Sequence, residues 1–127
     1  MKYHHTGIVV ASIENSINIY LKLGYTQVGR IVTDIIQNNR IVFLISDNLP
    51  NIELIEAINE ASTVYKSKLG YHHICYESEC LDEDIVKNFN ALRVGKIFTK
   101  PLLAPALDNR EVVFACLQNG TFIELII

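Results

Sequence analysis

The chain has 127 residues, of which half are hydrophobic and a fifth are charged, and its formal net charge is −3. These values predict a single globular domain, residues 1–127, and exclude a disordered chain. Lysine and arginine residues are scattered, so the basic stripe of a nucleic-acid surface is missing, and the apolar runs are too short to span a membrane. We therefore expect neither a nucleic-acid partner nor a membrane.

The three cysteines, Cys75, Cys80 and Cys116, are an odd number and form no CxxC motif. We expect no secretion signal at the N-terminus, because Met1 leads quickly into charged, strand-like sequence. Reduced thiols and a cytoplasmic location follow from these two expectations. Free cysteines usually act as small buried hydrophobic residues, so we expect no catalytic role for them.

The first half of the chain predicts the element order β-α-β-β-β. Residues 3–11 form a β-branched run, and Ser12 can cap the following helix because its hydroxyl accepts amide hydrogens of the first turn. The helix has apolar residues at helical spacing and ends at Gly24. Turn residues separate the predicted strands that follow. These strands are 27–36, 40–46 and 52–56.

The second half repeats this order. We interpret the polar residues 57–70 as a linker, with room for one short helix, between module one (1–56) and module two (71–127). Strand 71–77 precedes helix 82–92, whose three acidic residues favour its N-terminus through the helix dipole. The remaining predicted elements are strand 96–100, an irregular loop at 101–105, and strands 111–117 and 121–127 joined by a turn.

The two halves also match residue by residue, with an offset of 71 in their last two strands. The matched segments are 42–44 with 113–115 and 52–55 with 123–126. His5 and His73 differ by 68, so the insertions lie between the first and last strand of a module. This internal repeat predicts an α+β fold of two βαβββ modules in a pseudo-two-fold arrangement.

Each module places one histidine and one glutamate on a half-buried strand face, because side chains alternate across a strand. They are His5 and Glu53 in module one, and His73 and Glu124 in module two. One such residue alone is usually structural or solvent-facing. A carboxylate within a hydrophobic strand is costly to bury unless it is paired or binds a metal. Four such residues at matched positions therefore predict one shared metal site.

His4 and His72 should point to the opposite strand faces, which predicts structural roles, although a register error of one residue would exchange the roles within each His-His pair. Two imidazoles and two carboxylates suit a divalent ion such as Zn, Ni, Co or Mn. The absence of cysteine from the set disfavours a closed structural zinc site.

These motifs resemble the vicinal oxygen chelate (VOC) superfamily, which includes glyoxalase I (lactoylglutathione lyase), methylmalonyl-CoA epimerase, drug-resistance proteins and extradiol dioxygenases. The resemblance covers essentially the whole chain and rests on residues 5–10, 52–55, 70–74 and 120–125. Carried over residue by residue, the metal ligands of the superfamily fall on His5, Glu53, His73 and Glu124. The set is most similar to that of glyoxalase I and the epimerase, and the linker more closely resembles the epimerase.

The resemblance implies a metal-dependent isomerase or lyase that removes a proton α to a carbonyl and stabilises the enediolate or enolate. It implies Glu124 as a catalytic base and, for an epimerase, Asp34 as a second base. The implied substrate is an acyl-CoA thioester or a glutathione-type hemithioacetal. The alternative is a small-molecule binding or resistance protein of the same fold without catalysis.

The substrate, the metal and the location of the site, within one chain or across a dimer, stay open. Exposed strand edges favour a homodimer. By position alone, the candidate pocket residues are Arg30, Arg40, Phe98, Leu103 and Arg110.

Overall fold

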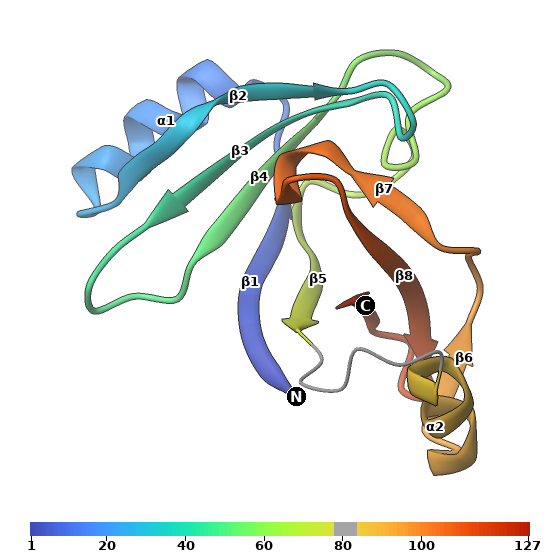
Figure 1. Ribbon diagram of the computed structural model, residues 1–127. Helices are drawn as coiled ribbons and strands as arrows, with labels where there is room; N and C mark the ends of the chain where they lie inside the picture. The colour runs from blue at the N-terminus through green and yellow to red at the C-terminus, as the bar shows by residue number, and fades with distance from the viewer. Residues whose placement is uncertain (78–83) are drawn as a thin grey trace. The chain divides into compact units, whose positions relative to one another are not determined.

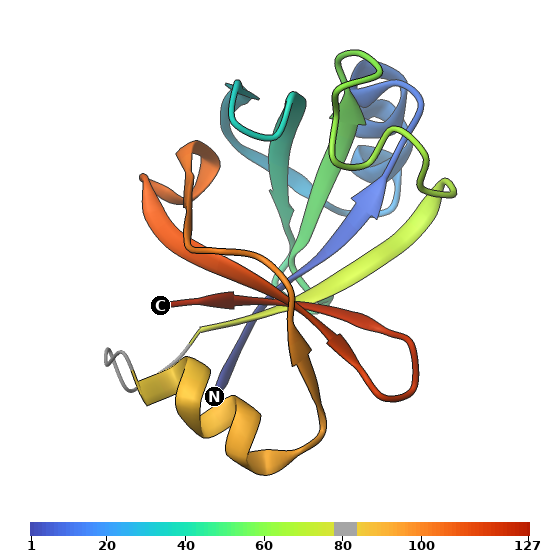
Figure 2. The same cartoon turned by 90° about the vertical axis from the view of Figure 1, so that its right-hand side faces the viewer.

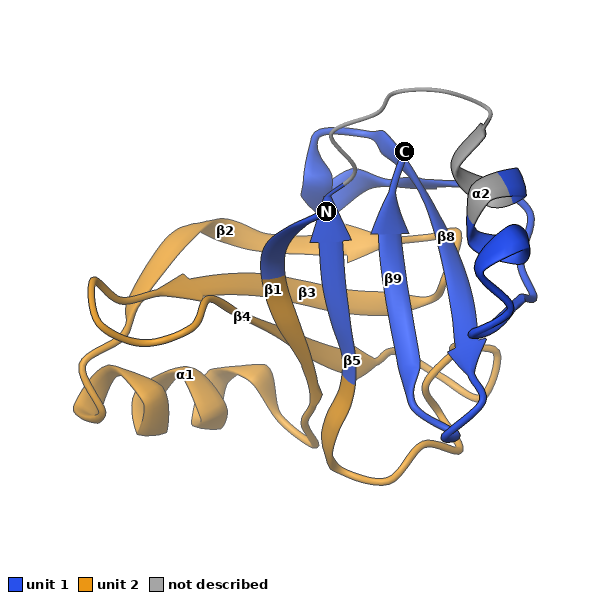
Figure 3. Cartoon of the chain, turned by 90° about the horizontal axis from the view of Figure 1, so that it is seen from below, with its two compact units in different colours: residues 1–4, 73–127 blue, residues 5–72 orange. Residues whose placement is uncertain are grey.

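The structure, a computed structural model, describes residues 1–77 and 84–127 (Figure 1 and Figure 2). The chain divides into two compact units, unit 1 with residues 1–4 and 73–127 and unit 2 with residues 5–72 (Figure 3). Strands β1 (Lys2–Val9) and β5 (Gly70–Glu77) each begin in one unit and end in the other. The division therefore falls inside both His-His pairs.

Unit 2 is a four-stranded sheet in the order β2-β3-β4-β1, with β1 parallel to β4 and the other neighbours antiparallel. Helix α1 (Ile13–Lys22) packs on one face. Ser12 caps it as predicted, because its hydroxyl accepts the amide hydrogen of Asn15 at 3.3 Å. The remaining strands are β2 (Thr26–Asp34), β3 (Asn39–Ile45) and β4 (Ile52–Ala57).

The core of unit 2 lies between α1 and the sheet. Its buried residues are Ile13, Ile17, Val42, Leu44, Ile52 and Leu54. Because side chains alternate along a strand, the residues between these strand positions project from the opposite face. Phe43 and Glu53 are therefore on the face that α1 does not cover.

Unit 1 has the strand order β5-β9-β8-β6, and β7 also pairs with β8. Strands β5 and β9 are parallel and the other pairs are antiparallel. Figure 2 shows α2 leading through a turn into β6. The elements are α2 (Asp84–Leu92), β6 (Gly95–Ile97), β7 (Leu102–Ala104), the 3-10 helix η1 (Pro105–Leu107), β8 (Arg110–Leu117) and β9 (Phe122–Ile126).

A second core packs Phe89 of α2 against β8 and β9, and its strand residues are Val113, Ala115, Ile123 and Leu125. These residues alternate with Phe114 and Glu124, so unit 1 repeats the two-faced arrangement of unit 2. The predicted α+β fold of two modules of the βαβββ type is confirmed. No helix among residues 1–77 and 84–127 is long and apolar enough to cross a membrane.

Module two departs from the prediction between its helix and β8. The strand expected at 96–100 ends at Ile97, and the loop expected at 101–105 contains β7. Both short strands pair with β8, one beyond the other. Unit 2 uses one strand here, β2, whose pairing shifts register between Val28 and Val32. The interruption of strand pairing is therefore longer in module two than in module one. It includes Pro101, which has no amide hydrogen to donate to a neighbouring strand.

The linker contains turns and no helix. Polar contacts hold it to the β2–β3 turn. The amide of Thr63 donates to the carbonyl of Gln37 at 3.0 Å. Asn39 donates to the Thr63 hydroxyl at 3.1 Å and accepts from the Ser62 hydroxyl at 2.5 Å. Cys80 and the predicted helix start at residue 82 lie outside the described residues.

Candidate functional site

In unit 2, His5 and Glu53 form a buried pair on the sheet face that α1 does not cover. The imidazole Nε2 of His5 lies 3.3 Å from the Glu53 carboxylate oxygen Oε2. Phe43 is the register partner of Glu53, and its ring meets the imidazole edge-on with centroids 5.0 Å apart. The pair is thus held on parallel strands β1 and β4 and backed by an aromatic ring from β3.

Unit 1 contains the same three residue types in the same relation. His73 Nε2 lies 3.4 Å from Glu124 Oε2. Phe114 is the register partner of Glu124, and its ring meets the imidazole edge-on with centroids 5.7 Å apart. The internal repeat of the sequence is therefore a repeat of side-chain arrangement as well as of strand order.

The geometry of each pair fits two ligands of one metal ion. His and carboxylate bonds to zinc are about 2.0–2.2 Å long, which in a tetrahedral site places adjacent ligand atoms roughly 3.3–3.5 Å apart. The two observed separations, 3.3 and 3.4 Å, fall in this range. They are longer than the ~2.7–2.9 Å of a charge-assisted hydrogen bond. None of the four side chains belongs to a residue more than 5% exposed, so their burial favours a bound cation over a solvated ion pair.

The two phenylalanines are not among the site residues predicted from the sequence, although the internal repeat contains a signal for them. Phe43 and Phe114 are the central residues of the aligned segments at 42–44 and 113–115. Their strand register with the two glutamates places them on the site face and not in the core. The matched aromatic position of the internal repeat is therefore the sequence signal that points to them.

Asp34, the predicted second base, is fully buried at the end of β2. Its Oδ1 accepts the amide hydrogens of Ile36 and Gln37, both at 2.9 Å, and its Oδ2 accepts from the Gln37 side chain at 3.3 Å. These hydrogen bonds give Asp34 a structural role, because they close the β2–β3 turn. Its assignment as a base stays a prediction.

Arg40, a candidate pocket residue, forms ion pairs with two carboxylates. It pairs with Glu14 of α1 and, at 3.3 Å, with Glu56 of β4. The hydrogen bond from Arg40 lowers the pKa of the Glu14 carboxyl, and the same bond raises the pKa of Arg40. Glu56 also accepts the first amide hydrogen of α1, from Ile13, at 2.7 Å. This network fixes the start of the helix on the sheet.

Arg110 is similarly engaged in unit 1. It donates to Glu77 at 2.5 Å, and its other terminal nitrogen lies 3.2 Å from Nε2 of His4. Because a guanidinium only donates, Nε2 of His4 accepts in this contact. Arg30, Phe98 and Leu103 are exposed. Cys75 is buried and Cys116 half-buried, and no disulfide joins them in the described part of the chain.

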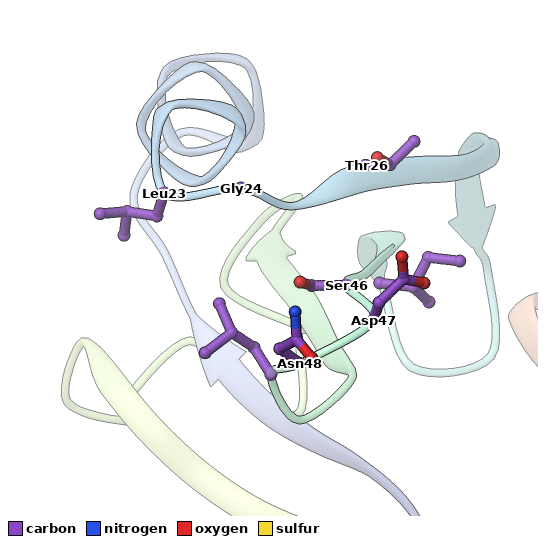
Figure 4. A pocket seen from close by; sticks show the side chains of 8 residues that line it. Leu23, Gly24, Thr26, Ser46, Asp47 and Asn48 are labelled. Carbon is purple, nitrogen blue, oxygen red and sulfur yellow. The ribbon is translucent and has the colours of Figure 1, made fainter.

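A surface hollow of about 590 Å³ lies in unit 2 between the end of α1 and the β3–β4 connection (Figure 4). Its labelled lining includes Leu23 and Gly24 on one side and Ser46, Asp47 and Asn48 on the other. Neither member of the histidine–glutamate pair lines it, so it is separate from the candidate site.

The two modules, each with a buried histidine–glutamate pair, define a protein of the VOC fold. The family model described as the glyoxalase/bleomycin resistance protein/dioxygenase superfamily matches residues 4–93. The chain belongs to this superfamily. No curated protein sequence matches it.

Several solved structures share the fold. A hypothetical protein from Bacillus halodurans C-125 has 23% identity over 98% of this chain and 92% of its own, with a TM-score of 0.84. Methylmalonyl-CoA epimerase from Mycobacterium tuberculosis has 20% identity over 98% and 86%, with a TM-score of 0.82. The Streptomyces coelicolor epimerase in complex with 2-nitronate-propionyl-CoA has 20% identity over 99% and 96%, with a TM-score of 0.76. At these identities the likeness shows the fold alone.

Proposed function

We propose that His5, Glu53, His73 and Glu124 are the ligands of one divalent metal ion, and that the protein is a metal-dependent isomerase or lyase. The observation that carries the proposal is the buried histidine–glutamate pair, present in each module with separations of 3.3 and 3.4 Å. One pair offers only two ligands, whereas a catalytic ion needs three or more protein ligands and an open position. Two pairs together satisfy that need.

The metal, when bound, supplies a Lewis acid that stabilises negative charge on adjacent substrate oxygens. The four proposed ligands would hold the ion, and the residues of this chain would also remove and return the substrate proton. Glu124 is the proposed base for the proton α to the carbonyl, because its carboxylate is on the site face and almost completely buried. Phe43 and Phe114 pack against the imidazoles and keep water from that side of each pair. A low-dielectric setting strengthens the electrostatic stabilisation.

The proposed substrate is an acyl-CoA thioester, in an epimerase-type reaction. Structures with the same fold include methylmalonyl-CoA epimerase in complex with methylmalonyl-CoA. A glutathione-type hemithioacetal, as in glyoxalase I, is the second substrate class, because the His–Glu–His–Glu set suits both reactions. We further propose a homodimer and a cytoplasmic location.

The reaction is tested with the metal-loaded protein in D2O. Methylmalonyl-CoA should exchange its C2 hydrogen for deuterium, whereas lactoylglutathione formation from methylglyoxal and glutathione should not be accelerated. Glu124→Gln should slow the exchange about 10²–10⁴-fold, as expected for loss of a general base. Glu111→Gln, a change at an exposed glutamate of β8, is the matched control and should leave the rate unchanged.

The opposite substrate preference would assign the protein to the glyoxalase type. Stoichiometric metal with neither reaction would favour the alternative, a binding or resistance protein that uses the fold without catalysis.

A further inference from the structure

Two exposed aromatic side chains continue the site face of unit 1 beyond the His73–Glu124 pair. Phe122, the first residue of β9, is the direct register partner of His73 on β5. These two parallel strands lie side by side in unit 1 (Figure 3). Register partners on neighbouring strands lie about 5 Å apart and project from the same face. The ring of Phe98, which follows β6, lies 5.8 Å from that of Phe122.

These rings are not needed for the core of unit 1. The residues of β9 that pack beneath α2 are Ile123 and Leu125, which project from the opposite face. Phe98 is 56% exposed and Phe122 is 39% exposed, although they contact each other. An adjoining pair of large apolar side chains beside convergent polar groups is typical of a ligand-binding surface.

Unit 2 has no such pair at the equivalent positions. Val28 is the register partner of Phe43. Phe98 has the same relation to Phe114, whose carbonyl oxygen accepts its amide hydrogen at 3.0 Å. Asn51 is the equivalent of Phe122, because the two positions differ by the repeat offset of 71. The two modules therefore match in their histidine–glutamate pairs but differ at these two positions, which are aromatic in unit 1 and are Val28 and Asn51 in unit 2.

We propose that Phe98 and Phe122 form an aromatic platform that binds the apolar group of the substrate, such as its acyl chain. This inference rests on the proposed function. A ligand whose adjacent oxygens bound an ion held by His73 would have Phe122 beside it, because His73 and Phe122 are register partners. Since Val28 and Asn51 stand at the equivalent positions of unit 2, we expect the apolar group to contact the aromatic pair of unit 1. This orientation decides which substrate hydrogen faces Glu124.

The test uses full-length protein loaded with Co²⁺, whose visible spectrum reports on its ligands, and two hydroxamates that chelate through adjacent oxygens. Octanohydroxamate should bind at least about tenfold more tightly than acetohydroxamate, as expected from burial of roughly two methylene groups. Phe98→Ala and Phe122→Ala should reduce this preference about fivefold or more and leave acetohydroxamate affinity within about twofold. Phe98→Leu, which keeps apolar area, should restore part of it.

Val28→Ala, the equivalent change in unit 2, is the matched control and should keep the full preference. An unchanged preference in Phe98→Ala and Phe122→Ala, both folded by circular dichroism, would overturn the platform. The platform would also be overturned if light scattering showed that these variants convert a dimer to a monomer without changing the preference. The rings would then contact a second copy of the chain. A cobalt spectrum that responds to neither hydroxamate would overturn the metal site of the proposed function, and the platform with it.

Discussion

His5 stands two residues before Gly7, the register partner of Glu53 on the neighbouring parallel strand, and its Nε2 lies 3.3 Å from the Glu53 carboxylate. His73 stands in the same relation to Glu124, two residues before its register partner Cys75. A diagonal of this kind lets a ring and a carboxylate from adjacent strands meet without distortion of either backbone. The strand register, which both modules share, therefore brings a histidine and a glutamate together in each module.

Asp34→Ala should destabilise the protein by about 1–3 kcal/mol, because the half-buried amide of Ile36 and the buried amide of Gln37 lose their acceptor. Urea denaturation measures this loss. Asp34→Asn keeps an acceptor oxygen and should retain most of the stability. If Asp34→Asn is folded and still exchanges the C2 hydrogen but no longer epimerises, Asp34 is also the second base. Full epimerisation by this variant would refute that assignment and leave the turn as the role of Asp34.

Leu54→Ala and Leu125→Ala remove equivalent core residues, one in each unit, and each should cost about 2–5 kcal/mol. Since we expect residues 1–127 to form one domain, both variants should shift a single unfolding transition of the whole chain, measured by calorimetry and circular dichroism. Leu103→Ala, at an exposed position, is the control and should change stability by less than about 0.5 kcal/mol. Two separate transitions, each affected by only one of the core variants, would show independently folding units.

The ion pair between Glu14 and Arg40 should make a small, pH-dependent contribution to stability. Arg40 holds the pKa of Glu14 below its usual value of 4.5, so the stabilising effect is present above that pH. It is lost as the pH falls through the lowered pKa of the folded state. Glu14→Gln should therefore be less stable than the wild type at neutral pH and equally stable in strong acid.

The comparison is made by urea denaturation across this pH range, in low and in high salt, because an exposed pair is screened. Glu60→Gln, at an exposed glutamate of the linker, is the control. A stability difference for Glu14→Gln that persists unchanged in acid would contradict the electrostatic explanation.

Local sequence patterns predicted most of the fold, because the strands alternate and the module is written twice. They placed His5 and Glu53 away from the core formed by residues such as Leu54. The division of one predicted strand into β6 and β7 could not be predicted, since it depends on pairing with a distant strand. The same applies to the ion pairs of Arg40 with Glu14 and Glu56, because both carboxylates are distant from Arg40 in the sequence.

The metal content of the purified, reconstituted protein tests the central claim most directly. Inductively coupled plasma mass spectrometry should find about one divalent ion per chain in the wild type. It should find less than about a tenth of that in His5→Ala and in His73→Ala. His72→Ala, a change beside a proposed ligand, should retain the ion. Absence of metal from the wild type would contradict the claim. So would two ions per chain, or a His5→Ala protein that keeps its ion, because each pair would then bind separately.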